Sequence, residues 1–529
     1  MRRFSSYGPL DLDLHYYAPR QKLINKAFNQ LIGNNKGGHY ITVWAPRQSG
    51  KTWTLQQVVK KIKLLDMFEV AIISMGSGKS IETRKGILNL FCSRISEFLK
   101  ISLPELDMWE ELKLIFSSQY FSKPLILIID EFDALDEKFI NQFANEFREM
   151  YISRQNEDNP SNEKTCILHG LALIGVRSVL GIENVKGSPF NVQRSTYIPC
   201  LTKDEVKKIY QWYEKESQQK IEPEVIEKIY YEFKGQPGLT CWFGEVITEM
   251  YNKEPDKPIT IKHFNRAYTF ATHALPNNNI INIISKAKID PYKEIVLDLF
   301  KTDQKKKFSY DDYFLNYLYM NGIIDIDDQT ENDGYIYVRF ASPFVQKRLF
   351  NFFSRELFRE MGQLIEPFTS LKNIINENRI NIKNVMRLYE EYLRKNRHWL
   401  LNDAPKRKDL RIFEAVYHFN LYMYLNLFLH PKNAYVYPEF PTGNGKIDII
   451  IKYFQKVYGI ELKTYTDESS YKKAILKAAS YGKQLQVKKI YLVFFIEFID
   501  EENRSKYEII HNDKNTGVSV EIIFIMTGT

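Results

Sequence analysis

The chain has 529 residues, which is too many for a single hydrophobic core, so we expect two to four domains. Its composition, 44% hydrophobic and 26% charged, is typical of a globular protein, and the sequence has no internal repeat or low-complexity segment. The net charge of +8 is compatible with a nucleic-acid partner, and equally with a lysine-rich solvated surface.

Cysteine usage and hydropathy bear on the cellular compartment. The four cysteines are Cys92, Cys166, Cys200 and Cys241. None forms a CxxC pair, so we expect free thiols and neither a zinc site nor a disulfide framework. The N-terminus lacks the apolar core of a signal peptide. The most apolar run, 413–430, contains Glu414, His418 and two asparagines, which favours a buried amphipathic helix over a membrane span. We therefore expect a cytoplasmic protein with no membrane partner.

Residues 1–200 alternate apolar runs with helical stretches, which is typical of βαβ units around a parallel sheet. The predicted strands are 39–45, 69–75, 124–130 and 168–175. Residues 201–285 predict a helical lid with helices at 201–213, 223–233 and 238–251. Thr202, which precedes an acidic turn, is the expected N-cap of the first of these helices.

The middle of the chain changes character. Residues 286–350 predict two helices, at 291–301 and 311–322, and then a strand pair within 333–343. This order is typical of a winged helix, which either contacts DNA or serves only as a packing domain. We expect a helical linker over 351–409 and a second α/β domain over 410–529.

The strand-to-helix segment that starts at Tyr40 contains the letters APRQSGKT. They match a phosphate-binding loop, G-x-x-x-x-G-K-[ST], with alanine in place of the first glycine. In such a loop Gly50 and the helix N-terminus offer N–H groups to the β-phosphate, Lys51 neutralises the β- and γ-oxygens, and Thr52 ligates Mg²⁺. The alternative is a chance strand–turn–helix. The predicted nucleotide-binding residues here are Ala45, Gln48, Ser49, Gly50, Lys51, Thr52 and Trp53.

A second motif follows the apolar run 124–130, where Asp130 and Glu131 stand at the end of the predicted strand. Asp130 fits the carboxylate on the Mg²⁺ side of a nucleotide site, and Glu131 would orient the attacking water. The alternative is a helix-capping pair after a buried strand. Together the two motifs predict ATP binding and ATP hydrolysis.

With the segments 16–28, 171–180 and 233–243, these motifs resemble the AAA-like ATPases related to the STAND group. The resemblance covers about residues 10–285, and it accounts for Ala45, because members of that group carry APRQ-type loops. It implies that Arg177 is a sensor for the γ-phosphate, that Pro237 packs near the base, and that Arg20 lies close to the nucleotide. By residue type alone, Arg177 is equally a surface ion-pairing residue and Pro237 an ordinary helix breaker.

Near the C-terminus, three charged residues interrupt two apolar, strand-like runs. Asp448 lies in the first run, and Glu461 and Lys463 lie in the second. Residues i and i+2 of a strand face the same side, and a hairpin would return the second run beside the first, so we expect all three to converge. Two carboxylates can hold Mg²⁺ or Mn²⁺ and leave positions for water and phosphate, while Lys463 would position either one. The alternative is a buried ion pair in a non-catalytic fold.

This pattern resembles the PD-(D/E)XK nuclease superfamily. Glu414, on the helix before the hairpin, stands where many members carry a further acidic residue, and a GNGKID turn leads into Asp448. The proline that often precedes the aspartate is absent. In relatives, the helix after the second strand faces DNA. Its counterpart here carries Lys477, Tyr481 and Gln484 on one face, although a solvated lysine face fits the pattern equally.

The predicted fold class is therefore multidomain α/β: a P-loop NTPase parallel sheet with a helical lid and winged helix, followed by a restriction-endonuclease-like α/β domain. Our leading hypothesis is an ATP-dependent DNA nuclease that uses ATP and Mg²⁺, and that forms a homo-oligomer if ATP bridges subunits. Defence against foreign DNA, mobile-element processing and repair all suit it. The second hypothesis is a nucleotide-dependent sensor or scaffold with a protein partner, which grips nucleic acid without cutting. An RNA target stays open.

Overall fold

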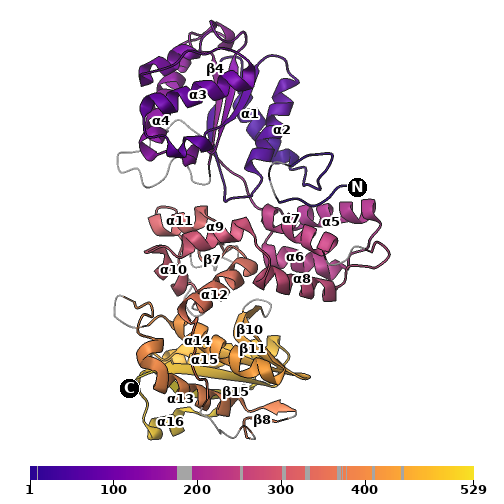
Figure 1. Cartoon of the computed structure of the whole chain (residues 1–529), viewed down its shortest axis with the longest axis vertical. Helices are drawn as coiled ribbons and strands as arrows, with labels where there is room; N and C mark the ends of the chain where they lie inside the picture. Colours follow the sequence, from indigo (N-terminus) through magenta and orange to yellow (C-terminus); the bar gives the residue numbers. More distant parts are fainter. Residues whose placement is uncertain are drawn as a thin grey trace. The chain divides into compact units, whose positions relative to one another are not determined.

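The computed structural model describes residues 1–528 apart from 7, 9, 176–193, 251–253, 301–305, 328–333, 366–370, 372, 377, 408–411 and 442–445. The chain divides into two compact units, Met1–Lys286 with Lys307–Val345 and Ala287–Lys306 with Gln346–Thr529. Figure 1 shows the elements of both units, coloured along the sequence.

A five-stranded parallel sheet forms the centre of the first unit, in the order β2-β3-β4-β1-β5. Its strands are β1 (Tyr40–Trp44), β2 (Glu69–Ser74), β3 (Leu125–Asp130), β4 (Leu168–Gly175) and β5 (Arg194–Tyr197). The four predicted strands are confirmed. The short, polar β5 was not predicted, because its structure depends on pairing with β1 rather than on an apolar run.

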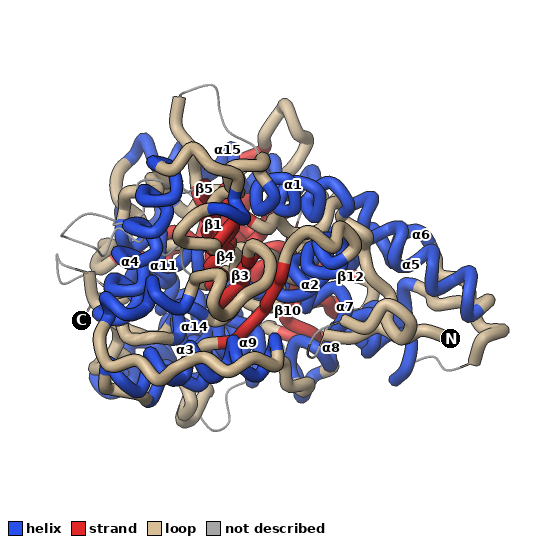
Figure 2. The backbone as a smooth tube through the Cα atoms, turned by 90° about the horizontal axis from the view of Figure 1, so that it is seen from above, coloured by secondary structure: helices blue, strands red, loops and turns tan. Residues whose placement is uncertain are grey.

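Helices cover both faces of this sheet (Figure 2). They are α1 (Gln21–Ile32), α2 (Lys51–Lys63), α3 (Arg84–Leu99) and α4 (Glu137–Asn156). Alternate residues of β3 enter two separate cores: Ile126 and Ile128 pack with α1 and α2, whereas Leu127 and Ile129 pack with α3 and α4. Burial on both faces explains why the central strands read as continuous apolar runs.

The helical part of the first unit follows β5. It contains α5 (Lys203–Ser217), α6 (Pro223–Phe233), α7 (Pro237–Glu245), a π-helical turn (Val246–Met250), α8 (Ile261–His273) and α9 (Asn278–Ala287). Thr202 is the N-cap of α5, as predicted, and forms a capping box with Glu205.

The rest of the first unit contains α11 (Tyr313–Met320), β6 (Ile324–Ile326) and β7 (Val338–Phe340). The two strands form an antiparallel pair. The prediction of both strands within 333–343 was wrong, because the partner of β7 precedes the segment DDQTENDG. That run of turn-forming residues separates the two strands and does not introduce them. Part of this segment, 328–333, lies outside the described residues.

The second unit begins with helical elements and a small hairpin. They are α10 (Tyr292–Asp298), most of α12 (Pro343–Leu357), β8 (Ile375–Asn376), β9 (Arg379–Ile380) and α13 (Ile382–Leu400). The predicted winged-helix-like segment 286–350 is thus shared between the two units.

The main sheet of the second unit is mixed and six-stranded, in the order β10-β11-β12-β13-β15-β14. Its elements in chain order are α14 (Glu414–Leu429), β10 (Ala434–Pro441), β11 (Lys446–Tyr453), β12 (Lys456–Thr464), α15 (Glu468–Gln484), β13 (Lys489–Ile496), α16 (Glu501–Tyr507), β14 (Ile510–Asn512) and β15 (Ser519–Met526). β10, β11 and β12 are antiparallel, whereas α15 crosses from β12 to the parallel strand β13. α15 packs on one face of the sheet, and the aromatic rings of α13 and α14 contact the other face at Phe495.

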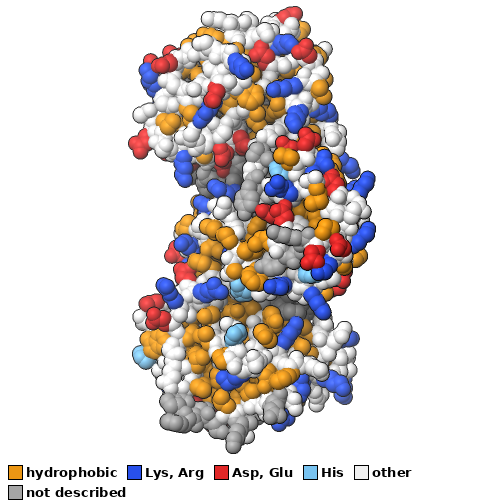
Figure 3. Space-filling model, turned by 45° about the vertical axis from the view of Figure 1, so that its right-hand side comes forward, with side chains coloured by type: hydrophobic (Ala, Val, Ile, Leu, Met, Phe, Trp, Pro, Cys, Tyr) orange, Lys and Arg blue, Asp and Glu red, His pale blue; other side chains and the backbone are white. Residues whose placement is uncertain are grey.

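The apolar run 413–430 is a buried helix, α14, as predicted, but the prediction that it is amphipathic was wrong, because residues on all sides of α14 are buried. Across the described part of the chain, no helix is long and apolar enough to cross a membrane. The four cysteines, all among the described residues, are free thiols. Not all apolar side chains of the second unit are buried: Figure 3 shows hydrophobic side chains on its visible face, with Lys and Arg side chains among them.

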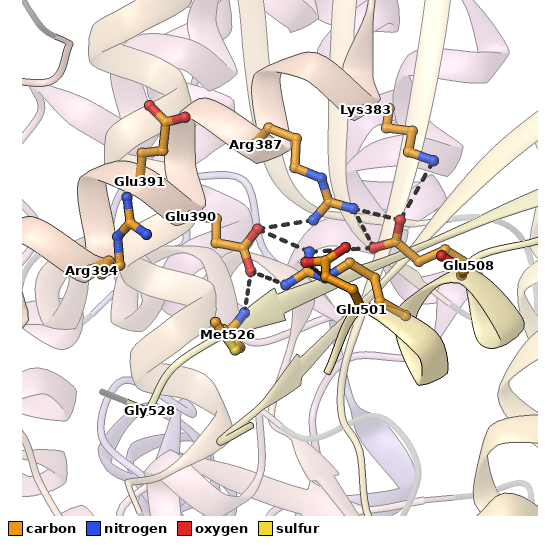
Figure 4. Close-up of a pocket in the computed structure, with 11 residues that line it drawn as sticks. Lys383, Arg387, Glu390, Glu391, Arg394, Glu501, Glu508, Met526 and Gly528 are labelled. Carbon is orange, nitrogen blue, oxygen red and sulfur yellow. Dashed lines mark hydrogen bonds and ion pairs between the residues drawn. The ribbon is translucent and has the colours of Figure 1, made fainter. Parts of the chain in front are cut away.

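An ion-pair network joins α13 to the C-terminal elements of the second unit (Figure 4). Glu390 on α13 accepts hydrogen bonds from Arg504 on α16 at 2.8 Å, from the Met526 N–H of β15 at 2.7 Å, and from Arg387 at 2.9 Å. Arg387 in turn pairs with Glu508. These residues border a cavity of about 470 Å³. Because its charges are paired with one another, we assign the cavity lining a structural role.

Glu390→Gln is expected to destabilise the second unit. Burial alone would raise the pKa of Glu390, but the hydrogen bonds from Arg504 and Met526 and the charges of Arg504 and Arg387 outweigh it, so the pKa lies below the ordinary value of 4.5. Losing charged hydrogen bonds of this kind removes about 2 kcal/mol, which lowers the thermal midpoint of a unit of this size by roughly 4–8 °C.

The matched control is Glu391→Gln, because Glu391 is the next residue of α13 and is exposed. Since the pKa of Glu390 is depressed, its contribution is present at neutral pH and is lost as the pH falls below about 4.5 and through the lowered pKa. Equal midpoints for the two variants at pH 7, measured by thermal unfolding of the full chain, would contradict the assignment.

Candidate functional site

The phosphate-binding loop lies between the buried strand β1 and the helix α2, which begins at Lys51. Gly50 has a φ of 85°, a conformation that residues with a Cβ rarely adopt. Gln48 also has a positive φ, 55°, and the Ser49 hydroxyl donates to the Pro46 carbonyl at 2.7 Å. The loop thus has a defined conformation that places the N-terminus of α2 at its mouth, where an anion is favoured.

Lys51 folds back on this loop. Its Nζ donates to the carbonyl oxygens of Ala45 at 2.7 Å and Pro46 at 2.9 Å. Burial lowers the pKa of Lys51 to about 8, although the charges of Asp133 and Asp130 act in the opposite direction. An anionic phosphate would replace these carbonyls as the partner of the ammonium group and would favour its charged form.

Thr52 lies on α2, which follows β1, and Asp130 ends β3. The two residues are in contact although β4 separates β1 from β3 in the sheet. The Thr52 hydroxyl donates to Asp130 Oδ2 at 2.5 Å, and the Glu131 N–H donates to Asp130 Oδ1 at 2.8 Å. Burial raises the pKa of Asp130, while these hydrogen bonds oppose the rise. A hydroxyl beside a carboxylate is the donor pair that the Mg²⁺ of a bound nucleotide requires.

Glu131 points toward the end of β2 and is held there. Its Oε2 accepts a hydrogen bond from the Ser74 hydroxyl at 2.6 Å, and its φ is 54°. The carboxylate lies against Gly76, where a Cβ would approach Glu131 Oε2 to 2.4 Å. Sequence reasoning missed Ser74. Ser74 ends the strand next to β3 and pairs in register with Asp130, a relation that appears only once the two strands are paired.

Two of the remaining predicted nucleotide residues, Arg20 and Trp53, have contacts that the structure describes. Arg20 has a positive φ of 46°, and its Nη2 donates to the Pro199 carbonyl at 2.5 Å, just before α5. Trp53 is buried and its ring lies 5.5 Å from that of Tyr17. Arg177 lies outside the described residues, so its predicted role stays a prediction.

Pro237 is the first residue of α7, whose N-terminal turn packs on the phosphate-binding loop. The Gly238 N–H donates to the Gln48 carbonyl at 3.0 Å, and a Cβ on Gly238 would come within 2.5 Å of Gln48. Gln236, which sequence reasoning did not assign, donates to the Arg47 carbonyl at 2.9 Å. This turn therefore links the helical lid to the loop that would bind phosphate.

In the second unit, the structure brings Asp448, Glu461 and Lys463 together. The antiparallel register of β11 and β12 pairs Ile449 with Ile460, which places Asp448 opposite Glu461. Lys463 Nζ lies 3.1 Å from Glu461 Oε1, and the Leu462 N–H donates to Asp448 Oδ2 at 2.7 Å. All three side chains are buried, with exposed fractions of 2% for Asp448, 0% for Glu461 and 3% for Lys463.

Burial and like charge disfavour the ionised form of Glu461 in this cluster. Burial and the charge of Asp448 raise the pKa of Glu461 to about 7, against the lowering effects of Lys463 and Lys477. The charge of Lys477, on α15, is among those that lower the pKa of Glu461. Two buried carboxylates that repel each other are stabilised when a metal ion or a proton lies between them.

Two residues of α14 support the cluster from the other side of the sheet. Glu414 is buried and its Oε2 accepts a hydrogen bond from the Thr464 N–H at 2.7 Å, directly after Lys463. His418, which sequence reasoning did not assign, lies with Nε2 3.1 Å from the Asp448 carbonyl oxygen. Glu414 thus contacts the end of β12 and fixes its position relative to α14.

The carboxylates suit a hard divalent cation, because Mg²⁺ prefers oxygen ligands. Across the described residues, no group of three or more His, Cys, Asp or Glu side chains is arranged to hold a metal ion. A metal at this position would therefore take two side-chain carboxylates, from Asp448 and Glu461, and complete its coordination with backbone or solvent oxygen.

Comparison with known proteins found a family model that matches part of the first unit. Residues 5–245 match a family model described as an AAA-like domain. The match spans 241 of the 529 residues, which is less than half of the chain. It contains the loop, Asp130, Glu131 and the Pro237 turn that sequence reasoning had assigned. A search of curated proteins found no match for the chain.

Three solved structures illustrate the extent of the similarity. A Walker-type ATPase of Pyrococcus abyssi has 14% identity and a TM-score of 0.43, covering 65% of this chain and 99% of that one. The ORC2 protein of Aeropyrum pernix has 14% identity and a TM-score of 0.38, with 66% and 95% covered. A Thermotoga maritima RuvB variant has 12% identity and a TM-score of 0.34, with 61% and 93% covered. Scores below 0.5 carry no argument about this chain.

Lys51→Ala is expected to abolish nucleotide binding, because it removes the ammonium group that faces the phosphates. In the wild-type protein, ATP affinity should fall as the pH rises above about 8. Lys51 of the nucleotide-free protein loses its proton in that range, whereas bound phosphate raises the pKa of Lys51, so binding ATP requires that the proton be taken up again. Isothermal titration of Mg²⁺-free ATP between pH 7 and pH 9.5 measures both effects.

The control for this prediction is Lys51→Arg, whose guanidinium keeps its charge over the whole pH range. If it binds ATP, its affinity should not change with pH. Tight ATP binding by Lys51→Ala would refute the assignment of the loop, and a flat wild-type profile would refute the role of the Lys51 proton.

Glu131→Gln should slow ATP hydrolysis about 100-fold or more while leaving ATP binding intact, because the amide cannot take a proton from the attacking water. Steady-state phosphate release and ATP titration measure the two quantities. Glu137→Gln, at an exposed position of α4, is the matched control. Unchanged turnover in Glu131→Gln would move the catalytic role to another residue.

Proposed function

We propose that this protein binds and hydrolyses ATP in its AAA-like domain and cleaves DNA phosphodiester bonds with the second unit, in a metal-dependent reaction that the ATPase domain gates or assembles. The observation that carries the proposal is the convergence of Asp448, Glu461 and Lys463 on one face of a sheet, in a chain that also brings Thr52 to Asp130.

At the nucleotide site, each residue has a separate task. The N–H groups of the loop and of the α2 N-terminus would receive the β-phosphate, and Lys51 would leave its carbonyl partners for the phosphate oxygens. Thr52 and Asp130 would hold the Mg²⁺ that accompanies ATP. Glu131, released by Ser74, would orient the attacking water.

At the nuclease site, Asp448 and Glu461 would hold Mg²⁺ or Mn²⁺ through carboxylate oxygens. When bound, such an ion acidifies water and stabilises the charge that develops at phosphorus. Lys463 would exchange its contact with Glu461 for the scissile phosphate or the water, and Glu414 would keep the end of β12 in place. Lys477, on α15, would attract the phosphate backbone toward the cluster.

The order of elements also supports a nuclease of the PD-(D/E)XK type. A helix, α14, precedes three antiparallel strands, and a crossover helix, α15, leads to the parallel strand β13. The three signature residues occupy the second and third of these strands. Defence against foreign DNA and mobile-element processing are roles that such a combination would suit.

A second candidate function has an observation in its favour. The cluster is nearly inaccessible, with at most 3% of any of its three side chains exposed, and Lys463 is engaged with Glu461. A protein that used this cluster only as a buried ion pair would be a nucleotide-dependent sensor or scaffold, and its second unit would grip nucleic acid without cutting it.

Cleavage assays separate these two functions. Linear, circular and single-stranded DNA and a matching RNA would be incubated with the full chain in Mg²⁺ or Mn²⁺, with and without ATP. We expect metal-dependent cutting that Asp448→Ala and Lys463→Ala each reduce by 100-fold or more, as is typical when a group that acts on the transition state is removed.

The matched control is Glu468→Ala, because this carboxylate lies nearby in sequence but is exposed, and it should cut like the wild type. Thermal unfolding would verify that each variant is folded. Cutting that survives both Asp448→Ala and Lys463→Ala would refute the assigned site. Absence of cutting by the wild type under every condition would favour the sensor or scaffold.

A further inference from the structure

The edge strand β10 carries two exposed tyrosines. Tyr435 is 55% exposed and Tyr437 is 39% exposed, although aromatic residues of a strand are usually buried on one side of the sheet. The two residues are separated by one position, so they lie on the same face. β10 is the outermost strand of the sheet on this side.

The face that carries these tyrosines is the face that carries the carboxylate cluster. Tyr435 pairs with Lys452, and Tyr437 pairs with Ile450. Alternation along β12 places Glu461 and Lys463 on the side of Gly459, the partner of Ile450, and Asp448 joins them through its contact with the Leu462 N–H. Directly paired residues of antiparallel strands share a face, so these side chains belong to one surface.

α15 covers the middle of this surface, and the tyrosines lie beyond its C-terminal end. A Cβ on Gly459 would lie 3.1 Å from Leu485, which follows α15 directly. From the spacing of strands and of residues along them, Tyr437 and Glu461 are separated by roughly 12 Å. A polymer that reaches the cluster could therefore contact both places at once.

The surroundings of the tyrosines are basic. Residues 430–438 and 452–457 include Lys432, Lys452, Lys456 and His430, and the acidic residue Glu439 follows the first of these ranges. Lys452 is exposed, and its Nζ lies 5.2 Å from the centroid of the Tyr437 ring. Exposed aromatic rings next to lysines match a surface on which bases stack while phosphates meet positive charge.

We propose that Tyr435, Tyr437 and Lys452 form a platform that binds an unpaired nucleic-acid strand leading to the Asp448–Glu461–Lys463 cluster. The bases stack on the tyrosines, and Lys452 contacts the phosphates. Bases of a duplex are already stacked and cannot do this, so the platform selects single-stranded segments. The inference rests on the proposed function in one respect, the nucleic-acid substrate, and it adds the class of substrate and the residues that choose it.

Binding without cleavage tests the platform. Fluorescence anisotropy in EDTA would compare the full chain on labelled oligothymidine and oligouridine of about 20 nucleotides and on a duplex of equal length. We expect tighter binding of the single strands, and binding weakened about tenfold or more in Tyr435→Ala with Tyr437→Ala. The double phenylalanine variant keeps both rings and should bind like the wild type.

Two further variants complete the design. Phe498→Ala, which removes an aromatic ring that is 67% exposed elsewhere in the unit, should not change binding. Lys452→Ala should weaken binding and reduce its dependence on salt, because one phosphate contact is lost. The oligothymidine and oligouridine arms distinguish DNA from RNA as the natural strand.

Three results would overturn the inference. The double alanine variant would bind single strands as tightly as the wild type, or the wild type would bind duplex more tightly than single strands. In the third, the double alanine variant would lose self-association of the chain but keep its nucleic-acid binding. The last would make the edge strand a protein contact. The nuclease assignment is tested separately: Asp448→Ala affects cutting without removing the platform. Either claim can therefore fail while the other stands.

Discussion

Three charged side chains buried within one sheet are the constraint around which the second unit is built. Removing a carboxylate from water is unfavourable unless an opposite charge and hydrogen bonds replace the lost solvation. Here Glu461 meets Lys463 at 3.1 Å, and Asp448 accepts the Leu462 N–H. These contacts compensate only in part, because burial and Asp448 still raise the pKa of Glu461 to about 7. A fold that needed only stability would be served as well by apolar residues at these positions.

In the first unit, the residues of the nucleotide site come from separate strands and are brought together by the order of the sheet. Thr52 follows β1 and Asp130 ends β3, and the parallel arrangement with β4 between them places both carboxyl ends at one edge of the sheet. The turn at Pro237 then attaches the helical lid to the same loop through Gly238 and Gln48. A change at the phosphates would therefore reach the lid directly through this contact, which is the physical basis of the gating proposed above.

Much of this could be predicted from the sequence, because the relevant signals are local. The alternation of side chains along a strand predicts that Glu461 and Lys463 lie on the same face of the sheet. Continuous apolar runs predict the strands β1 to β4. The failures have tertiary causes. β5 forms because it pairs with β1, and β6, the partner of β7, lies before a polar turn. Neither β5 nor β6 has a strong pattern of apolar residues of its own. Ser74 and His418 act through contacts with residues far along the chain, so no local pattern identifies them. The sequence allowed for a buried ion pair, but it could not predict how completely the cluster is enclosed, because accessibility depends on the packing of whole helices.

The central claim is that the nucleotide state of the AAA-like domain governs the chemistry of the second unit. The most direct measurement is the rate of single-stranded DNA cleavage in Mg²⁺, with and without ATP, by the wild type and by Lys51→Ala. The account predicts that ATP changes the wild-type rate and that Lys51→Ala, which retains Asp448, Glu461 and Lys463, does not respond to ATP. An identical response to ATP in both proteins would contradict it.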